Sequence, residues 1–249
     1  MSDANRINST PFGSGKFATT HWSMVLAAGD TSAFQHEQAL SSLCQTYWFP
    51  VYAFLRQCGH DAHQAEDHTQ GFITYLLEKH VLRRADPECG RFRSFLLGTL
   101  KHYLTDERDR AKAQKHGGGR QILSLDFADA ETKYVIEPAD NLSPEKLFDR
   151  YWALTVLNQT IRKLKMETEN AGKKNIFSAL KIYIASEGDS VPYRDMAKEQ
   201  NMTEGAIKVA VHRLRKRYRE LLREEIAHTV GSEEQIDAEI QDLFVAVAR

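Results

Sequence analysis

The sequence has little of what would cross-link a chain, interrupt helices or anchor it in a membrane. Its 249 residues include three cysteines, which are widely spaced and form no C-x-x-C pair. This pattern argues against a disulfide framework and fits reduced thiols in a cytoplasm. Six prolines leave long stretches free to be helical. No apolar run is long enough to cross a bilayer, which argues against secretion and membrane insertion.

Net charge is almost absent as well, but the charges are segregated along the chain. The formal net charge is -1 at pH 7. Residues 101–120 and 208–223 are basic, whereas residues 224–242 contain acids and no Lys or Arg. The sequence therefore predicts two basic zones suited to an anionic partner and an acidic C-terminal tail.

Apolar periodicity predicts an all-α fold with two small helical domains. In the first domain, the aromatic run at 47–55 is interpreted as core, and Pro50 is expected to bend the chain or start a new helix. Ser143 and Pro144 predict the start of a helix that Gly172 closes. The expected divisions are a disordered lead (1–20), a first helical domain (21–116), an acidic linker (117–142), a second helical domain (143–230) and an acidic extension (231–249).

Residues 193–219 are predicted to form a helix-turn-helix. Asn201 suits the left-handed conformation of a tight turn, and Thr203 suits the N-cap of the second helix. An ordinary helical hairpin with a solvated basic face is the alternative interpretation. Turn chemistry, spacing and charge together favour DNA binding. The candidate contacts on the second helix are Thr203, Lys208, His212, Arg213, Arg215 and Arg217.

The helix expected at 62–80 has two different faces. One face is apolar, whereas Glu66, Asp67 and Gln70 lie three or four residues apart on another. This polar face is either solvated surface or a docking face for a basic partner. A rival interpretation uses His60, His63 and Asp67, spaced i, i+3 and i+7, as metal ligands.

The stretch from 83 to 119 mixes basic and aromatic residues. Single-stranded nucleic acid requires cations for its phosphates and flat faces for its bases, and this mixture supplies both. Some of the aromatic residues can equally form the buried side of a helix. The candidate contacts are Arg91, Phe92, Arg93, Lys101, His102, Tyr103 and Arg108.

In combination, these motifs resemble bacterial RNA polymerase sigma factors of the extracytoplasmic-function (ECF) type, in a long planctomycete-like subgroup. The resemblance is carried by Ala-Glu-Asp-His-Thr-Gln at 65–70, Gly-Arg-Phe-Arg-Ser-Phe-Leu at 90–96 and Glu-Gly-Ala-Ile-Lys at 204–208, and it covers roughly 22–242. The sequence departs from the family's pattern at Gln64 and Gly71, where acids are common, and at Ala210, where Arg is common.

The resemblance implies a transcription initiation factor without catalytic residues, cofactor or metal. The 21–116 domain would bind core RNA polymerase, through its β′ and β subunits, and melt the −10 element as a single strand. Glu66, Asp67 and Gln70 would form the polymerase-binding face. The 143–230 domain would read the −35 element as duplex DNA. The rivals are a helix-turn-helix regulator that does not bind polymerase and a metal-dependent enzyme.

Two further expectations concern regulation. Thr69, inside the expected docking helix, is a candidate for phosphorylation by a Ser/Thr kinase, because phosphate would restore negative charge. The alternative is a plain helix-surface or boundary residue. Residues 233–248 are expected to form an amphipathic helix. Its acidic side would either lie near the basic recognition helix or simply pack on the second domain.

Overall fold

The computed structural model describes residues 33–78, 81–84, 86, 90–113, 127, 130–136, 142–184, 191–227 and 229–248. Within these ranges the regular elements are all helices, with no strand, which confirms the predicted all-α fold. No helix there is both long and apolar enough to cross a membrane. The expected disordered lead at 1–20 lies outside the described residues.

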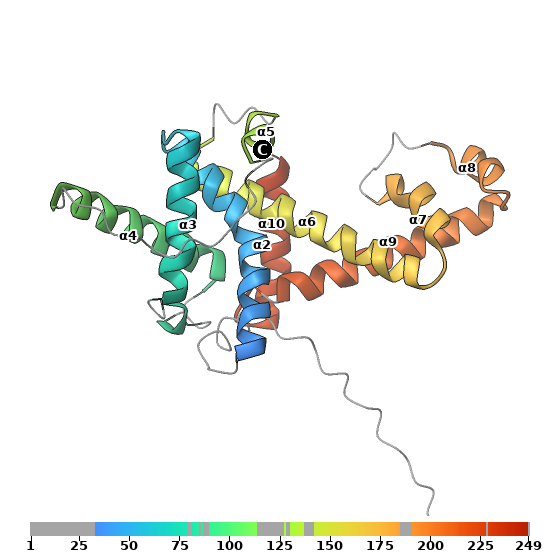
Figure 1. Ribbon diagram of the computed structural model, residues 1–249. Helices are drawn as coiled ribbons and strands as arrows, with labels where there is room; N and C mark the ends of the chain where they lie inside the picture. The colour runs from blue at the N-terminus through green and yellow to red at the C-terminus, as the bar shows by residue number, and fades with distance from the viewer. Residues whose placement is uncertain are drawn as a thin grey trace, which may run out of the picture.

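The helices form a larger body and a smaller end that are joined by two long helices. In Figure 1, α6 and α9 run from the body, which holds α2 to α5 and α10, to the end that carries α7 and α8. The bounds are α2 (Ala33–Gln57), α3 (Ala62–Glu78), η1 (Val81–Arg84), α4 (Phe92–Ala113), α5 (Ala130–Ile136), α6 (Pro144–Asn170), α7 (Lys174–Leu180), η3 (Lys181–Tyr183), α8 (Tyr193–Glu199), α9 (Glu204–Ala227), η4 (Glu233–Gln235) and α10 (Ile236–Ala248).

Helix α2 is continuous through Pro50, so the expectation that a new helix starts there is wrong. Proline has no amide hydrogen, and its presence inside a helix costs about 3 kcal/mol. Burial offsets this cost, because Val51, Tyr52 and Leu55 after the proline are fully buried. The aromatic run around Pro50 is core or packed against it, as expected.

Helix α6 belongs to two hydrophobic cores at once. It begins as predicted, with Ser143 at the N-cap and proline at the first helical position, and Gly172 follows its end with φ 72°. Its first half packs on α2 and places Phe148 and Trp152 in the core of the larger body, whereas Leu164 lies in the core of the smaller end. The boundary expected at residue 143 therefore does not separate the two cores.

Part of the expected acidic linker is a packed helix. The carboxylate of Glu131 on α5 accepts hydrogen bonds from Arg56 (2.7 Å) and from the Tyr52 hydroxyl (2.6 Å), both on α2. The hydrogen bond from Arg56 holds the pKa of Glu131 below its usual value. Ala130 is fully buried, and the Arg56 guanidinium lies over the ring of Tyr134. Residues 117–142 lack a sustained apolar period, so sequence periodicity missed this helix.

The amphipathic helix expected at the C-terminus exists, and η4 and α10 together span 233–248. Ile236 and Leu243 are buried in the core of the larger body, where α10 packs on α6 and the C-terminal part of α9. Asp237 pairs with Arg223 near the end of α9, but other acids of α10 face the start of α4. The acidic side is therefore not laid along the basic N-terminal half of α9.

The burial of α10 predicts that alanine substitutions at two neighbouring positions of this helix have different effects on stability. Leu243→Ala should lower the free energy of unfolding by about 2–5 kcal/mol, because it leaves a cavity in the core. Phe244→Ala is the matched control, since Phe244 is 51% exposed, and it should change stability by roughly 0.5 kcal/mol or less. Urea unfolding followed by circular dichroism measures both. Equal effects would show that α10 is not part of the core.

Candidate nucleic-acid interface

The turn between α8 and α9 is built by the residues that the sequence singled out. Asn201 has a φ of 51°, in the left-handed region, and the Thr203 hydroxyl accepts a hydrogen bond from the Ala206 amide at 3.2 Å. Met202 packs against the core that contains the fully buried Ile207, as a hydrophobic staple requires. The start of α9 is thus fixed relative to α8.

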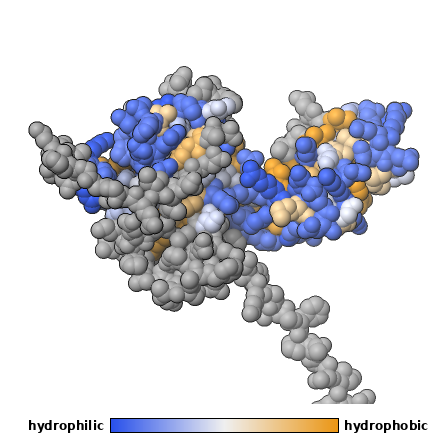
Figure 2. Space-filling view, in the orientation of Figure 1, coloured by the Kyte–Doolittle hydropathy of each residue, from blue (hydrophilic) through white to orange (hydrophobic). Residues whose placement is uncertain are grey.

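The N-terminal half of α9 exposes a basic face. Ile207, Val211 and Leu214 point into the core of the smaller end, so the opposite face of the helix is left to solvent. Lys208 pairs with Glu204 one turn earlier at 2.7 Å, which raises the pKa of Lys208. Figure 2 shows hydrophilic surface at the outer tip of this end, with hydrophobic patches between the tip and the larger body. The exposed basic side chains are Lys208, His212, Arg213, Lys216 and Arg219.

Two of the predicted DNA contacts on α9 are held by the protein itself. The Arg215 Nε donates to the Tyr183 carbonyl at 2.8 Å. Arg217 makes a two-pronged contact with Glu167 on α6, and its hydrogen bonds and carboxylate neighbours raise its pKa although burial lowers it. Arg215 thus contacts η3 and Arg217 contacts α6, from different sides of α9. Their assignment to DNA is corrected to a structural role in this arrangement.

The aromatic candidates of α4 are core residues. Phe92 is fully buried and packs edge-on against Tyr47 with 5.4 Å between ring centroids, while Tyr103 is 3% exposed against α3. The assignment of these two rings to DNA bases is therefore wrong for this arrangement. Of the other candidates on α4, Lys101, His102 and Arg108 are exposed. Lys101 pairs with Glu145 of α6 at 2.8 Å.

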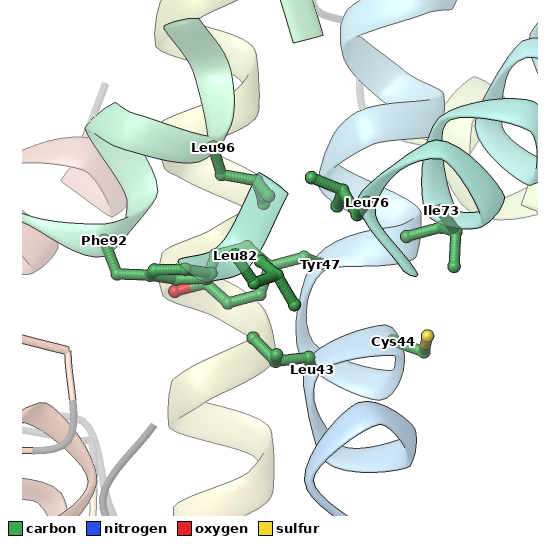
Figure 3. Close-up of a pocket in the computed structure, with 8 residues that line it drawn as sticks. All are labelled: Leu43, Cys44, Tyr47, Ile73, Leu76, Leu82, Phe92 and Leu96. Atoms are coloured by element: carbon green, nitrogen blue, oxygen red, sulfur yellow. The ribbon is translucent and has the colours of Figure 1, made fainter. Parts of the chain in front are cut away.

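A small cavity beside Phe92 does not make a ligand site. Figure 3 shows Phe92, Tyr47 and Leu82 turned toward one another at this cavity. Its volume of about 20 Å³ is far below the several hundred Å³ of ligand pockets, and its lining is apolar. Burial raises the pKa of the Cys44 thiol in its wall to about 11, which keeps that thiol protonated and unreactive.

The two remaining candidates, Arg93 on α4 and Arg91 just before it, are paired with carboxylates. Arg93 is 8% exposed and donates two hydrogen bonds, of 2.7 and 3.2 Å, to the carboxylate of Glu239 on α10. Arg93 also pairs with Asp149 of α6. Burial lowers the pKa of Arg93, but these carboxylates outweigh burial and raise it. Arg91 pairs with Glu239 at 2.8 Å and with Asp242.

The polar face of α3 is exposed in part. Asp67 is 66% exposed and pairs with His63 one turn earlier, while Glu66 and Gln70 are half-buried beside it. His60 instead packs against His68, and burial together with that neighbour lowers the pKa of His60. No group of three or more potential metal ligands gathers within the described ranges, so the proposed metal triad is not assembled there.

Two positions of α3, Thr69 and Gly71, lie in tightly packed surroundings rather than on the surface. Thr69 is fully buried, and its hydroxyl donates to the Ala65 carbonyl at 2.7 Å. Both interpretations of Thr69, as a phosphorylation site and as a surface residue, are therefore wrong for this fold. A Cβ at Gly71 would lie 2.3 Å from the Tyr103 hydroxyl oxygen. The close approach of α4 explains why no acid stands at position 71.

The burial of Thr69 leads to a stability prediction. Thr69→Glu should destabilise the fold by roughly 3–5 kcal/mol, because it places an uncompensated charge in the core. Gln70→Glu adds the same group one position along, at a half-buried site, and should cost far less. Thermal unfolding compares the two. A Thr69→Glu protein as stable as Gln70→Glu would contradict the burial.

The exposure of Arg213 leads to a binding prediction. Arg213→Ala should weaken binding to a random-sequence DNA duplex and reduce the slope of log K against log salt by about 1, the loss of one phosphate contact. Arg162→Ala is the control, since Arg162 is exposed on α6 and removes the same charge. Fluorescence anisotropy across a salt series measures both. Identical slopes for the two variants would exclude α9 as the duplex-binding helix.

Known proteins offer no template for this chain. No protein-family model, curated protein or solved structure matches the chain. The candidates that the structure leaves on the surface are the acidic face of α3, three side chains of α4 and the basic half of α9. The full set is Glu66, Asp67, Gln70, Lys101, His102, Arg108, Thr203, Lys208, His212 and Arg213.

Proposed function

We propose that the chain is a transcription initiation factor of the sigma type, which binds core RNA polymerase in the cytoplasm and directs it to promoters. The observation that carries the proposal is the basic face of α9, which is exposed at the end of the molecule and held by a capped turn. In this proposal the polymerase catalyses RNA synthesis. The chain supplies promoter choice and strand opening.

The start of α9 is suited to the major groove of duplex DNA, as expected for reading a −35 element. Lys208 and Arg213 offer cations for phosphates or for the acceptor edge of guanine. Val209 between them is 50% exposed and offers an apolar contact for a thymine methyl group. Cations and an apolar side chain on one helical face are the contact types that base reading uses.

The face of α3 is suited to a basic protein surface. Glu66 and Asp67 present two carboxylates beside the amide of Gln70, on the larger body and away from the basic half of α9. Charge complementarity steers association and fixes orientation. We assign this face to the basic helices of the polymerase β′ subunit, with β as a second contact. Separation of the two faces lets one chain hold polymerase and DNA together.

Strand opening is assigned to the exposed side of α4. Lys101 and Arg108 supply cations and His102 a flat ring, all exposed on one helix. A base that leaves the duplex loses its stacking, which costs a few kcal/mol. Contacts of the protein with the phosphates and with the base must offset this cost. The burial of Phe92 and Tyr103 removes two aromatic faces from this surface. Cationic contacts therefore carry most of the strand binding in the free protein.

A core-binding experiment tests the proposal against a regulator that never touches polymerase. Glu66→Lys/Asp67→Lys should abolish or strongly reduce retention of tagged protein on core RNA polymerase, because it reverses the charge of the docking face. The control is Glu233→Lys/Glu234→Lys, which makes the same charge change at exposed acids of η4. Pull-down with purified core enzyme measures retention. Unmodified protein that is not retained would favour the regulator instead.

A further inference from the structure

The C-terminal helix meets the start of α4 with its acids. Glu239 and Asp242 are three residues apart and therefore lie on the same face of α10. They contact Arg91 and Arg93, which are more than 140 residues earlier in the chain. These two arginines are among the residues that the sequence assigns to the single strand. The carboxylates thus occupy two guanidinium groups that the sequence assigns to strand binding and that lie beside the exposed side chains of α4.

The geometry of the contact is the one that a phosphate would use. A guanidinium binds carboxylate and phosphate groups with the same pair of parallel hydrogen bonds. Arg93 holds Glu239 in this two-pronged way, at 2.7 and 3.2 Å. Arg91 contacts Glu239 at 2.8 Å and also Asp242. A strand whose phosphates replaced the carboxylates would leave the arginines with equivalent partners.

The site has an open side from which a strand can approach. A cleft runs between α4, α6 and α10, and its walls include Arg91, Arg93, Lys146, Asp149 and Asp242. Asp242 is 47% exposed at this cleft, whereas Glu239 behind it is fully buried. In the free chain the carboxylates cancel the cations, so the cleft does not attract a polyanion. Asp242 is the acid that a strand would meet first.

We infer that α10 is an intramolecular competitor of nucleic acid, which closes the Arg91–Arg93 site by offering Glu239 and Asp242 in place of phosphates. This inference rests on the proposed strand-binding role of α4. It places the action of the C-terminal helix at the start of α4, away from the basic N-terminal half of α9, which was one of the two positions that the sequence left open. Binding of single-stranded DNA and docking of α10's acids are mutually exclusive at these two arginines.

The test removes one competing charge at a time in the full chain. Asp242→Asn should strengthen binding of fluorescein-labelled oligodeoxythymidylate at low salt by about two- to fivefold, the range for one exposed ion pair. Asp237→Asn is the matched control, because it removes the same charge from the same helix but pairs with Arg223, away from the cleft. It should leave the affinity unchanged. Adding Arg91→Ala to Asp242→Asn should cancel the gain.

Each result separates the inference from the proposed function. A gain with Asp242→Asn that Asp237→Asn lacks, and that Arg91→Ala removes, supports competition at this site. Equal affinities for the wild type and both Asn variants would overturn the inference while leaving strand binding by α4 intact. No binding of the oligonucleotide by any variant would overturn the inference together with the strand role. Retention on core polymerase, measured separately, shows whether the rest of the proposed function survives.

Discussion

The buried ion pair between Arg93 and Glu239 is the contact that sets where α10 docks on the larger body. It joins the start of α4 to α10, and the Arg93 guanidinium also lies 4.9 Å from the ring centroid of Trp152 on α6. Burying two charges costs several kcal/mol of desolvation free energy, and their mutual attraction mostly offsets this cost. We interpret the pair as fixing the register of α10, while Ile236 and Leu243 supply the apolar burial that stabilises it.

This constraint divides the cations of the chain into two kinds. On α9 the cations Lys208 and Arg213 are exposed at the far end of the molecule, where Lys208 pairs with the exposed Glu204 of the same helix. At the start of α4, Arg93 and the preceding Arg91 are paired with carboxylates of α10, one of which is buried. In the proposed function, such a chain would bind duplex DNA through α9 before its Arg91 and Arg93 are available to a single strand. Promoter recognition would then precede melting, and the closed site would limit binding to unrelated single strands.

Features that depend on local chemistry could be predicted from the sequence. Asn201 and Thr203 at the turn, and Ser143 at the start of α6, act through neighbours within four residues, so their residue types and spacing are sufficient. The periodic helices α3 and α6 are also where apolar spacing placed them. Local and tertiary preferences agree at these positions.

Features that depend on distant partners could not be predicted in the same way. Thr69 looks polar in the sequence, but its hydroxyl is satisfied by the helix backbone and its side chain is buried. Arg93 looks like a surface cation, yet its carboxylate partner lies 146 residues away. Nor does the sequence show that Tyr103 fills the space beside Gly71. Each of these outcomes is set by packing between helices, which apolar period and charge runs do not encode.

The most direct measurement of the central claim is transcription initiated in vitro. Purified protein and core RNA polymerase would be incubated with genomic DNA of the organism that encodes the chain, and the 5′ ends of the transcripts would be sequenced. If the chain is a sigma-type factor, the transcripts should begin at discrete start sites that are absent with core enzyme alone and that share two upstream sequence elements. Transcripts identical to those of core enzyme alone would contradict this claim.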